Sequence, residues 1–428
     1  MCYNRRVPTQ VAFKPLERGT LLLTILQDSL TPSTQAALKD VSDNAEAIGM
    51  PLYLVGGSVR DLILGRPIKD LDLVVEGDAT QVASELGEKH SGKVTLHPRF
   101  GTATISLQGR RIDQATARRE NYIRPGALPE VVASGLEDDL SRRDFSINAM
   151  ALPLTGTQKG ELIDLHGGQE DLAARSIRVL HDDSFSDDPT RMLRAIRYEG
   201  RLDFSLEEVT SRLLLEAVEE KKLTSITGDR IRRELELIFL EEEPVPILQR
   251  AGGLGVLDTI YLPMGRADFT PLKGISTDDD PLLYLGAFAY PLEHYEGEVL
   301  ISRLYMPNSW ASVVRDTISI RRGMEIDWVD LPQGELAGCL DRHSTTSVRA
   351  CCMLSTLVVR DLIQMYLDEM RQVKTILNGD DLITLGFPPG PAIGEVLRDL
   401  RYARVEGRVA SREDELRLAE QYLGGKGG

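Results

Sequence analysis

The segment 52–75, which reads LYLVGGSVRDLILGRPIKDLDLVV, constrains the fold more than any other part of this chain. Leu52–Val55 is a short apolar run typical of a buried strand, and the glycine pair that follows ends it. A helix is predicted over 58–64, where a glycine and a proline then stop it. The apolar run 71–75 predicts the next strand. We therefore expect a strand–helix–strand unit with a Gly-Gly turn at its first corner.

Two aspartates stand at the start of the second predicted strand. Because side chains alternate faces along a strand, Asp70 and Asp72 should project from one side and the leucines beside them from the other. Two converging carboxylates repel each other unless a cation lies between them, and a ligand set made only of oxygen suits Mg²⁺. Backbone amides at the glycine pair and at the helix start suit a polyphosphate. The segment therefore predicts a site for a metal ion and a nucleoside triphosphate.

Each half of this motif also has an ordinary explanation. A lone D-x-D is usually a solvated turn, and a lone glycine pair is usually a simple turn. Their combination within one strand–helix–strand unit is much less common by accident. A dinucleotide-binding loop fits poorly, because GGSVRD lacks the third glycine of G-x-G-x-x-G.

Two arginine-rich motifs follow. The first, DLSRRDFSINAMAL, contains Arg143 in an arginine pair, which is often a solvated patch but which also suits phosphate oxygens. A helix is expected over 146–152. The second, DDPTRMLRAIR, spaces Asp188, Arg191, Arg194 and Arg197 three residues apart on a predicted helix. The set winds round the helix and cannot all face one ligand, so Arg194 and Arg197 are expected to point elsewhere, to phosphates, RNA or the head domain.

The pair formed by Asp188 and Arg191 could select a base. Aspartate accepts from an exocyclic amine, and arginine donates to the adjacent ring nitrogen or carbonyl. Cytosine and adenine both present an amine beside an acceptor, whereas uracil and guanine would present a carbonyl to the carboxylate. When the motif is taken alone, an i,i+3 salt bridge on a solvent face is the better explanation of the same spacing.

Composition narrows the class of protein. A net charge of −16 over 428 residues argues against a protein that coats nucleic acid indiscriminately. No apolar run reaches the length of a membrane span, and MCYNRRVPTQ has no secretory h-region. The four cysteines show no metal-ligand spacing, so a cytoplasmic location is expected. The sequence pattern predicts a helix over 21–48, followed by alternating strands and helices to about 165. Helical periodicity takes over from 187 onward, so we expect an α/β head and a helical remainder.

Taken together, the motifs resemble those of the class II tRNA nucleotidyltransferase and bacterial poly(A) polymerase family. GGSVRDLILGRPIKDLDLVV, RRDFSINAMAL and DDPTRMLRAIRYEGRLDF occur in the family's order, and the C-terminal segment resembles the tail of CCA-adding enzymes. The resemblance implies a multi-domain α+β protein with a polymerase-β-like nucleotidyltransferase α/β head followed by an all-helical neck, body and tail. The corresponding bounds are 1–20 for an N-terminal extension, 21–170 for the head, 171–243 for the neck, 244–372 for the body and 373–428 for a tRNA-binding tail.

The same resemblance implies roles for individual residues. Asp70 and Asp72 match the catalytic magnesium ligands, and Asp113 lies on a strand where the superfamily often has a third carboxylate. The neck motif usually opens Glu-Asp, whereas this chain has Asp187-Asp188. The residues that match nucleotide-binding positions are Gly57, Arg60, Arg143, Asp188, Arg191, Arg194 and Arg197.

We therefore expect template-independent addition of C and A to the 3′ end of tRNA from CTP and ATP with Mg²⁺, without a membrane or an obligatory protein partner. An A-adding-only enzyme or a poly(A) polymerase is the alternative, and an inactive nucleotide or RNA sensor is a more remote one. The segment 118–131 resembles the family's flexible loop. The resemblance implies that CC-only enzymes lack this loop, so its presence here disfavours a CC-only enzyme. A possible basic stripe in the tail, which could equally be an ordinary mixed-charge helix, comprises Arg398, Arg401, Arg404, Arg408 and Arg412.

Overall fold

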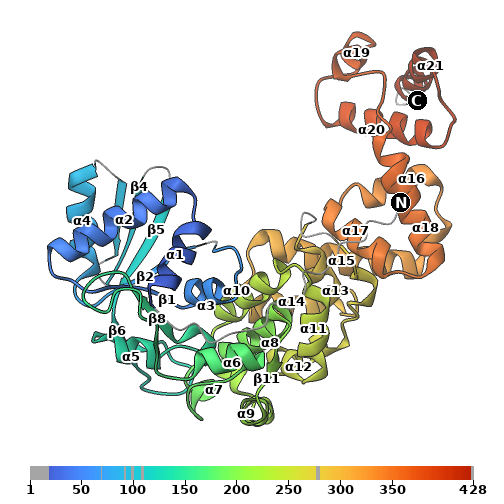
Figure 1. The fold of residues 1–428 in the computed structure, drawn as a ribbon. Coiled ribbons are helices and arrows are strands. Elements are labelled where there is room, and N and C mark those ends of the chain that lie inside the picture. Colours follow the sequence, from blue (N-terminus) through green and yellow to red (C-terminus); the bar gives the residue numbers. More distant parts are fainter. Residues whose placement is uncertain are drawn as a thin grey trace, which may run out of the picture. The chain divides into compact units, whose positions relative to one another are not determined.

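The computed structural model describes residues 19–68, 70–90, 93–97, 101–107, 110–275 and 280–425 (Figure 1). The chain divides into two compact units, 1–226 and 227–428. Of the predicted N-terminal extension, only its last two residues are described, and they begin the first helix. The finer five-part division of the chain stays a prediction.

A mixed seven-stranded sheet, in the order β3-β4-β5-β2-β1-β8-β9, forms the centre of the first unit (Figure 1). Neighbouring strands pair antiparallel except for β2 and β5, which run parallel with Asp72 opposite Asp113. The apolar runs predicted as strands are thus confirmed as sheet. The strands are β1 (Leu52–Val55), β2 (Asp72–Val75), β3 (Lys93–His97), β4 (Thr102–Leu107), β5 (Arg110–Thr116), β8 (Met150–Pro153) and β9 (Ile163–Asp164).

The single helix predicted over 21–48 is wrong, because the chain forms α1 (Gly19–Ser29) and α2 (Pro32–Ala47) instead. Pro32 occupies the first turn of α2, where its missing N–H costs nothing, and Thr31 caps that helix in an extended conformation. Helix α2 packs against α4 (Ala79–His90), which covers β3, β4 and β5.

The helix predicted over 146–152 is also wrong. Ser146–Asn148 is one turn of 3-10 helix, and Met150–Pro153 is strand β8, which pairs with β1 in the middle of the sheet. All four residues of β8 are buried. A short apolar run without alternation suits a buried helix and a buried strand equally, and pairing with β1 decides the outcome.

The segment 118–131 contains most of a hairpin that the sequence did not reveal. Strands β6 (Arg118–Asn121) and β7 (Glu130–Ala133) pair antiparallel, so the two ends of this segment form a ladder. The helical structure predicted from 187 onward is confirmed, and a two-residue parallel ladder of β10 (Ser176–Ile177) with β11 (Ser205–Leu206) accompanies it. The helices of this part are α3 (Gly57–Ile63), α5 (Leu136–Ser141), α6 (Gly168–Ala174), α7 (Ser184–Asp187), α8 (Thr190–Leu202) and α9 (Glu208–Glu219).

The second unit is helical over its described residues, so the α+β fold class is confirmed. Phe239 packs with Tyr284, Phe288 and Trp310 in its core, and the final helices α19 (Gly379–Thr384), α20 (Pro391–Val405) and α21 (Arg412–Gly425) have a separate apolar core. The others are α10 (Gly228–Phe239), α11 (Pro244–Gly253), α12 (Val256–Ile260), α13 (Leu283–Ala289), α14 (His294–Arg303), α15 (Asn308–Ile326), α16 (Gln333–Leu340), α17 (Thr345–Leu354) and α18 (Leu357–Asp368).

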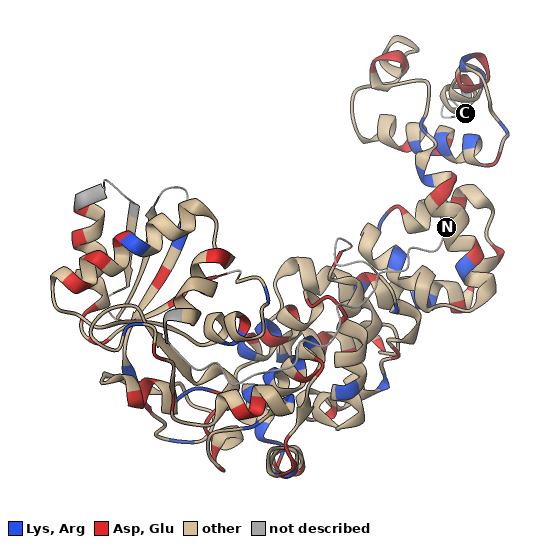
Figure 2. Ribbon diagram, viewed as in Figure 1, with Lys and Arg blue, Asp and Glu red and all other residues tan. Residues whose placement is uncertain are grey.

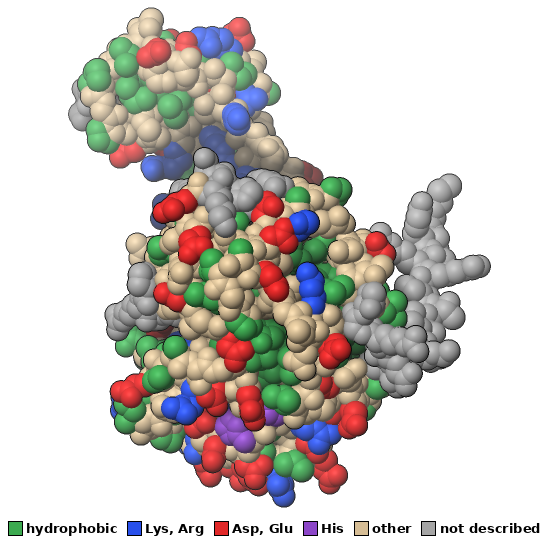
Figure 3. All heavy atoms as spheres, turned by 60° about the vertical axis from the view of Figure 1, so that its left-hand side comes forward, with side chains coloured by type: hydrophobic (Ala, Val, Ile, Leu, Met, Phe, Trp, Pro, Cys, Tyr) green, Lys and Arg blue, Asp and Glu red, His purple; other side chains and the backbone are tan. Residues whose placement is uncertain are grey.

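Charge is dispersed along both units. Figure 2 shows acidic and basic residues interleaved along the ribbon, and on the face in Figure 3 the Asp and Glu side chains are scattered among other side chains. Within the described part of the chain, no helix combines the length and the apolar character needed to cross a membrane.

The possible basic stripe of the tail is a mixed-charge surface. Each of its five arginines lies within ion-pair distance of a carboxylate, and three of these partners, Asp341, Asp381 and Glu415, come from other helices or loops. The pairs are Arg398 with Asp399, Arg401 with Asp341, Arg404 with Glu415, Arg408 with Glu406, and Arg412 with Asp381.

Candidate active site

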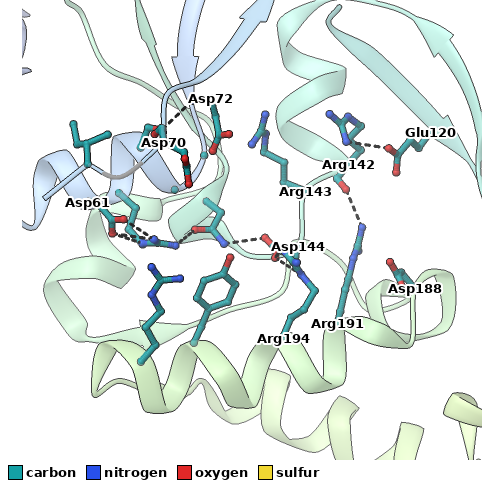
Figure 4. A pocket seen from close by; sticks show the side chains of 18 of the residues that line it. Asp61, Asp70, Asp72, Glu120, Arg142, Arg143, Asp144, Asp188, Arg191 and Arg194 are labelled. Atoms are coloured by element: carbon teal, nitrogen blue, oxygen red, sulfur yellow. Dashed lines mark hydrogen bonds and ion pairs between the residues drawn. The ribbon is translucent and has the colours of Figure 1, made fainter. Parts of the chain in front are cut away.

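A polar pocket of about 430 Å³ lies in the first unit, between the β1–α3 turn, the start of β2 and helix α8 (Figure 4). Asp70 and Asp72 lie at one end beside Arg143, and Asp188 and Arg191 lie at the other. Eight of the nine predicted site residues line it: Gly57, Arg60, Asp70, Asp72, Arg143, Asp188, Arg191 and Arg194.

Arg197 is the ninth. It is buried, with 4% of its surface exposed, and its guanidinium lies over the ring of Tyr198 rather than along the pocket wall. The prediction that Arg197 points away from Asp188 and Arg191 is therefore confirmed. Arg194 contacts Asp144 of the predicted head, which is one of the directions expected for it, and its side chain also lines the pocket.

The carboxylate pair at the start of β2 fits a divalent cation. Burial raises the pKa of the Asp72 carboxyl above its ordinary value, and Arg143 opposes that shift. The negative charges of Asp70 and Asp113 raise the same pKa further, and a cation between the carboxylates would relieve this repulsion. Among the described residues, no cluster of three or more His, Cys, Asp or Glu side chains is arranged to hold a metal. At the start of β2, the oxygen ligands for a metal ion would come from the aspartate pair.

Asp113 faces Asp72 across the parallel β2–β5 pairing. Its carboxylate accepts hydrogen bonds from Thr104 Oγ1 at 2.5 Å and from Arg111 Nε at 3.2 Å, and it does not line the pocket. Its assignment as a third carboxylate stays a prediction.

Gly56 allows Arg143 to lie against the turn before α3. Gly56 adopts φ +67°, and a Cβ there would approach Arg143 Nη1 to 2.7 Å. Arg143 in turn donates to Asp139 Oδ2 at 2.8 Å, and Arg142 donates to the other oxygen of the same buried carboxylate. Although burial acts to raise the pKa of Asp139, the two guanidinium groups hold it below its usual range. The buried aspartate thus orients the arginine pair.

A chain of hydrogen bonds links α3 to α8 along the floor of the pocket (Figure 4). Arg60 donates to Asp61 and to Asn148 Oδ1, and Asn148 donates to Asp144 at 3.0 Å. Arg194 donates to the second oxygen of Asp144 at 2.6 Å and 2.9 Å. Burial acts to raise the pKa of Asp144, but Arg194 and Asn148 lower it to about 2.

The other end of the pocket is built around Asp188 and Arg191. Asp188 Oδ1 accepts from the backbone N–H and the hydroxyl of Thr190, so it caps α8. Arg191 donates to Ser184 Oγ at 2.7 Å and to the carbonyl oxygen of Arg142 at 2.8 Å. Both side chains are therefore fixed in place at the pocket wall.

Sequence reasoning missed several residues of the pocket. Glu120 on β6 accepts from Arg142, and Tyr122 donates to Glu120 at 3.0 Å. Asp144 and Asn148 stand inside the quoted RRD motif, so the motif itself could have drawn attention to them. Glu120 and Tyr122 carry no such signal in the sequence. Arg142, the partner of Glu120, lies 22 positions away, and Tyr122 contacts Glu120 only within the hairpin.

This chain is similar in sequence to proteins of known family. The profile of the poly A polymerase head domain matches residues 52–178. An A-adding tRNA nucleotidyltransferase of Geobacter sulfurreducens is 35% identical over 92% of this chain, which covers only 48% of that protein. The chain spans about half the length of that relative.

Other relatives match along their whole length. An A-adding tRNA nucleotidyltransferase of Halalkalibacterium halodurans is 31% identical over 95% of this chain and 96% of its own length. A CC-adding tRNA nucleotidyltransferase of Deinococcus radiodurans is 32% identical over 92% and 95%. The solved structure of a CCA-adding enzyme in an apo form has a TM-score of 0.78 at 32% identity, covering 94% of this chain and 98% of that one. A Thermotoga maritima CCA-adding enzyme complexed with tRNA has a TM-score of 0.74 at 31% identity, covering 94% and 98%. The chain belongs to the tRNA nucleotidyltransferase family whose members carry a poly A polymerase head domain.

Proposed function

We propose that this protein extends the 3′ end of tRNA with C and A residues taken from CTP and ATP, without a nucleic-acid template. The proposal is carried by one observation. The carboxylates of Asp70 and Asp72 and the pair formed by Asp188 and Arg191 open onto the same pocket. A single cavity would thus hold one nucleoside triphosphate, with its phosphates at one end and its base at the other.

In this mechanism Asp70 and Asp72 would hold Mg²⁺. When bound, Mg²⁺ lowers the pKa of the primer 3′-hydroxyl and neutralises charge on the triphosphate and on the departing pyrophosphate. Arg143, which Asp139 orients, would contact phosphate oxygens. The absence of a side chain at Gly57 would leave room for the phosphates beside α3.

Base choice would depend on Asp188 and Arg191. Thr190 fixes the aspartate, and Ser184 with the Arg142 carbonyl fixes the arginine. A rigid acceptor beside a rigid donor matches the amine and the ring acceptor of cytosine and adenine. Uracil and guanine would leave both groups unpaired, which is the situation that gives strong discrimination. Arg60 and Arg194 would support the pocket through Asn148 and Asp144.

Addition of A alone is the second candidate. It is favoured by the two relatives named as A-adding, one of which matches 95% of this chain over 96% of its own length. A CC-only activity is disfavoured by the presence of the β6–β7 hairpin, whose residues Glu120 and Tyr122 line the pocket.

One experiment separates these activities. The protein is incubated with Mg²⁺ and tRNAs that end at the discriminator base, at C and at CC, with CTP and ATP supplied separately and together. Extension of all three substrates to CCA supports the full activity, and a single A added only to the CC-ended tRNA supports the second candidate. Long A tails would point to a poly(A) polymerase, and no incorporation at all would contradict the proposal.

We also propose that the chain comprises a head, neck, body and tail at the bounds predicted from its sequence. The separate apolar core around Leu382, Phe387 and Leu400 supports the tail as a substructure of its own. A cytoplasmic location is part of the same proposal, and the free thiols of Cys339, Cys351 and Cys352 support it.

A further inference from the structure

A buried serine beside the carboxylate pair has no role in the mechanism so far. Ser58 is the second residue of α3 and is 3% exposed. Its hydroxyl donates a hydrogen bond to the main-chain carbonyl oxygen of Asp70 at 2.8 Å and accepts one from the main-chain N–H of Asp72 at 3.1 Å. One side chain therefore holds the backbone on both sides of Leu71.

The sheet fixes Asp72 but does not reach Asp70. Strand β2 begins at Asp72, whose pairing with β5 starts opposite Asp113. Asp70 lies two residues before the strand, in a bend that follows the turn at Gly65. Its position relative to Asp72 must therefore come from contacts outside the ladder, and the Ser58 hydroxyl supplies one to each residue.

Helix α3 is a firm base for such a contact. Val59 and Leu62 are buried against the unit's core. Arg60, on the same helix, is 2% exposed and donates to Asn148 at 2.7 Å. The position of Ser58 is thus set by packing and by a buried hydrogen bond on the same helix. Through its hydroxyl, Ser58 in turn fixes the backbone at Asp70.

We propose that Ser58 is a positioning residue that sets the spacing of the Asp70 and Asp72 carboxylates for a divalent cation. The proposal rests on the proposed function, in which these carboxylates bind the metal. Groups that orient metal ligands without touching the metal typically contribute about 10- to 100-fold to metal affinity. Alanine at position 58 suits a helix and removes only the hydroxyl, so the fold is expected to persist.

The test compares Ser58→Ala with the parent protein in two measurements. Mn²⁺ binding in the presence of ATP is followed by the electron paramagnetic resonance signal of the free ion. The Mg²⁺ concentration that half-saturates A addition to CC-ended tRNA is measured separately. We expect the variant to need about 10-fold more of either metal, while the KM for ATP at saturating Mg²⁺ stays within about twofold.

Ser42→Ala is the matched control. Ser42 is also buried, and its hydroxyl also donates to a main-chain carbonyl oxygen, that of Leu38 at 2.8 Å, but it lies on α2 away from the pocket. It should bind both metals as the parent does. Both measurements are made at a temperature at which the parent and both variants are fully folded, so lost stability does not imitate the effect.

The outcomes separate this proposal from the one on which it rests. If Ser58→Ala binds Mn²⁺ and uses Mg²⁺ as the parent does, while Asp72→Asn abolishes incorporation, the role of Ser58 is overturned and the proposed function stands. If Asp72→Asn incorporates nucleotide as fast as the parent, the proposed function itself is wrong.

Discussion

Arg191 donates a hydrogen bond from Nη2 to the main-chain carbonyl oxygen of Arg142, 49 residues earlier in the chain, at 2.8 Å. Arg142 is itself held by Asp139 and by Glu120 of the β6–β7 hairpin. The arginine proposed to read the base is thus oriented from a segment that also contains Arg143, which is proposed to bind phosphate. In the proposed function, base selection and triphosphate binding would depend on the same segment.

Replacing Arg191 by lysine should therefore damage base selection while keeping the positive charge. A single ammonium cannot reach the Ser184 hydroxyl and the Arg142 carbonyl in the geometry of the guanidinium fork. We expect kcat/KM for ATP to fall about 100-fold and the discrimination against GTP to shrink, as measured by single-nucleotide incorporation into CC-ended tRNA. Arg212→Lys, on the exposed face of α9, is the control and should behave as the parent does. Unchanged discrimination in Arg191→Lys would remove this residue from the proposed reading pair.

Gly56→Ala and Gly65→Ala form a matched pair of variants. Both glycines adopt a positive φ, +67° and +64°, so both alanines should lower stability, and Gly56→Ala should lower it more because its ψ of −134° lies outside the left-handed helical region. Only at position 56 does the new Cβ collide with Arg143, at 2.7 Å, whereas nothing lies within 4 Å at position 65. Urea unfolding should show a loss for both, and incorporation assays at a temperature where both variants are folded should show a large loss for Gly56→Ala alone. Equal activities would mean that the place of Arg143 against the turn is unimportant.

The first strand and the turn after it were predictable because their causes are local. An apolar run before a glycine pair specifies β1, and the spacing of Asp70 and Asp72 follows from the same short segment. The place of Asp188 and Arg191 on one pocket wall could also be anticipated from their three-residue spacing, although Asp188 is extended and precedes α8 instead of lying on that helix.

The features that could not be predicted from the sequence depend on contacts between residues far apart in the chain. Strand β8 was predicted as a helix because its apolar run has no period, and only pairing with β1 defines it. The orientation of Arg194 depends on Asp144, 50 residues away, so helical spacing alone could not identify its partner. The role of Ser58 similarly depends on the return of the chain to Asp70.

Asp144 should make the first unit sensitive to acid. Its pKa is lowered from an ordinary value of 3.8 to about 2 in the folded protein, so the unfolded chain takes up the proton first. The stabilisation is complete above about pH 4 and is lost as the pH falls toward 2, with a size of at most about 2 kcal/mol. Asp144→Asn lacks this contribution, so its melting temperature should lie below that of the parent at pH 6 and approach it by pH 3. A gap that stays constant across that range would show that the ion pair with Arg194 does not carry the effect.

Asp113→Asn asks whether the third carboxylate takes part in metal binding. Asp113 faces Asp72 and contributes to its raised pKa, yet its own oxygens accept from Thr104 and Arg111. Its side chain is 53% exposed and does not line the pocket. We expect Asp72→Asn to reduce nucleotide incorporation by at least about 1,000-fold, since the metal supplies most of the charge stabilisation, and Asp113→Asn to reduce it less than about tenfold. Incorporation is measured at several Mg²⁺ concentrations. A loss in Asp113→Asn as large as that in Asp72→Asn, relieved by excess Mg²⁺, would make Asp113 a metal ligand and extend the carboxylate pair to three.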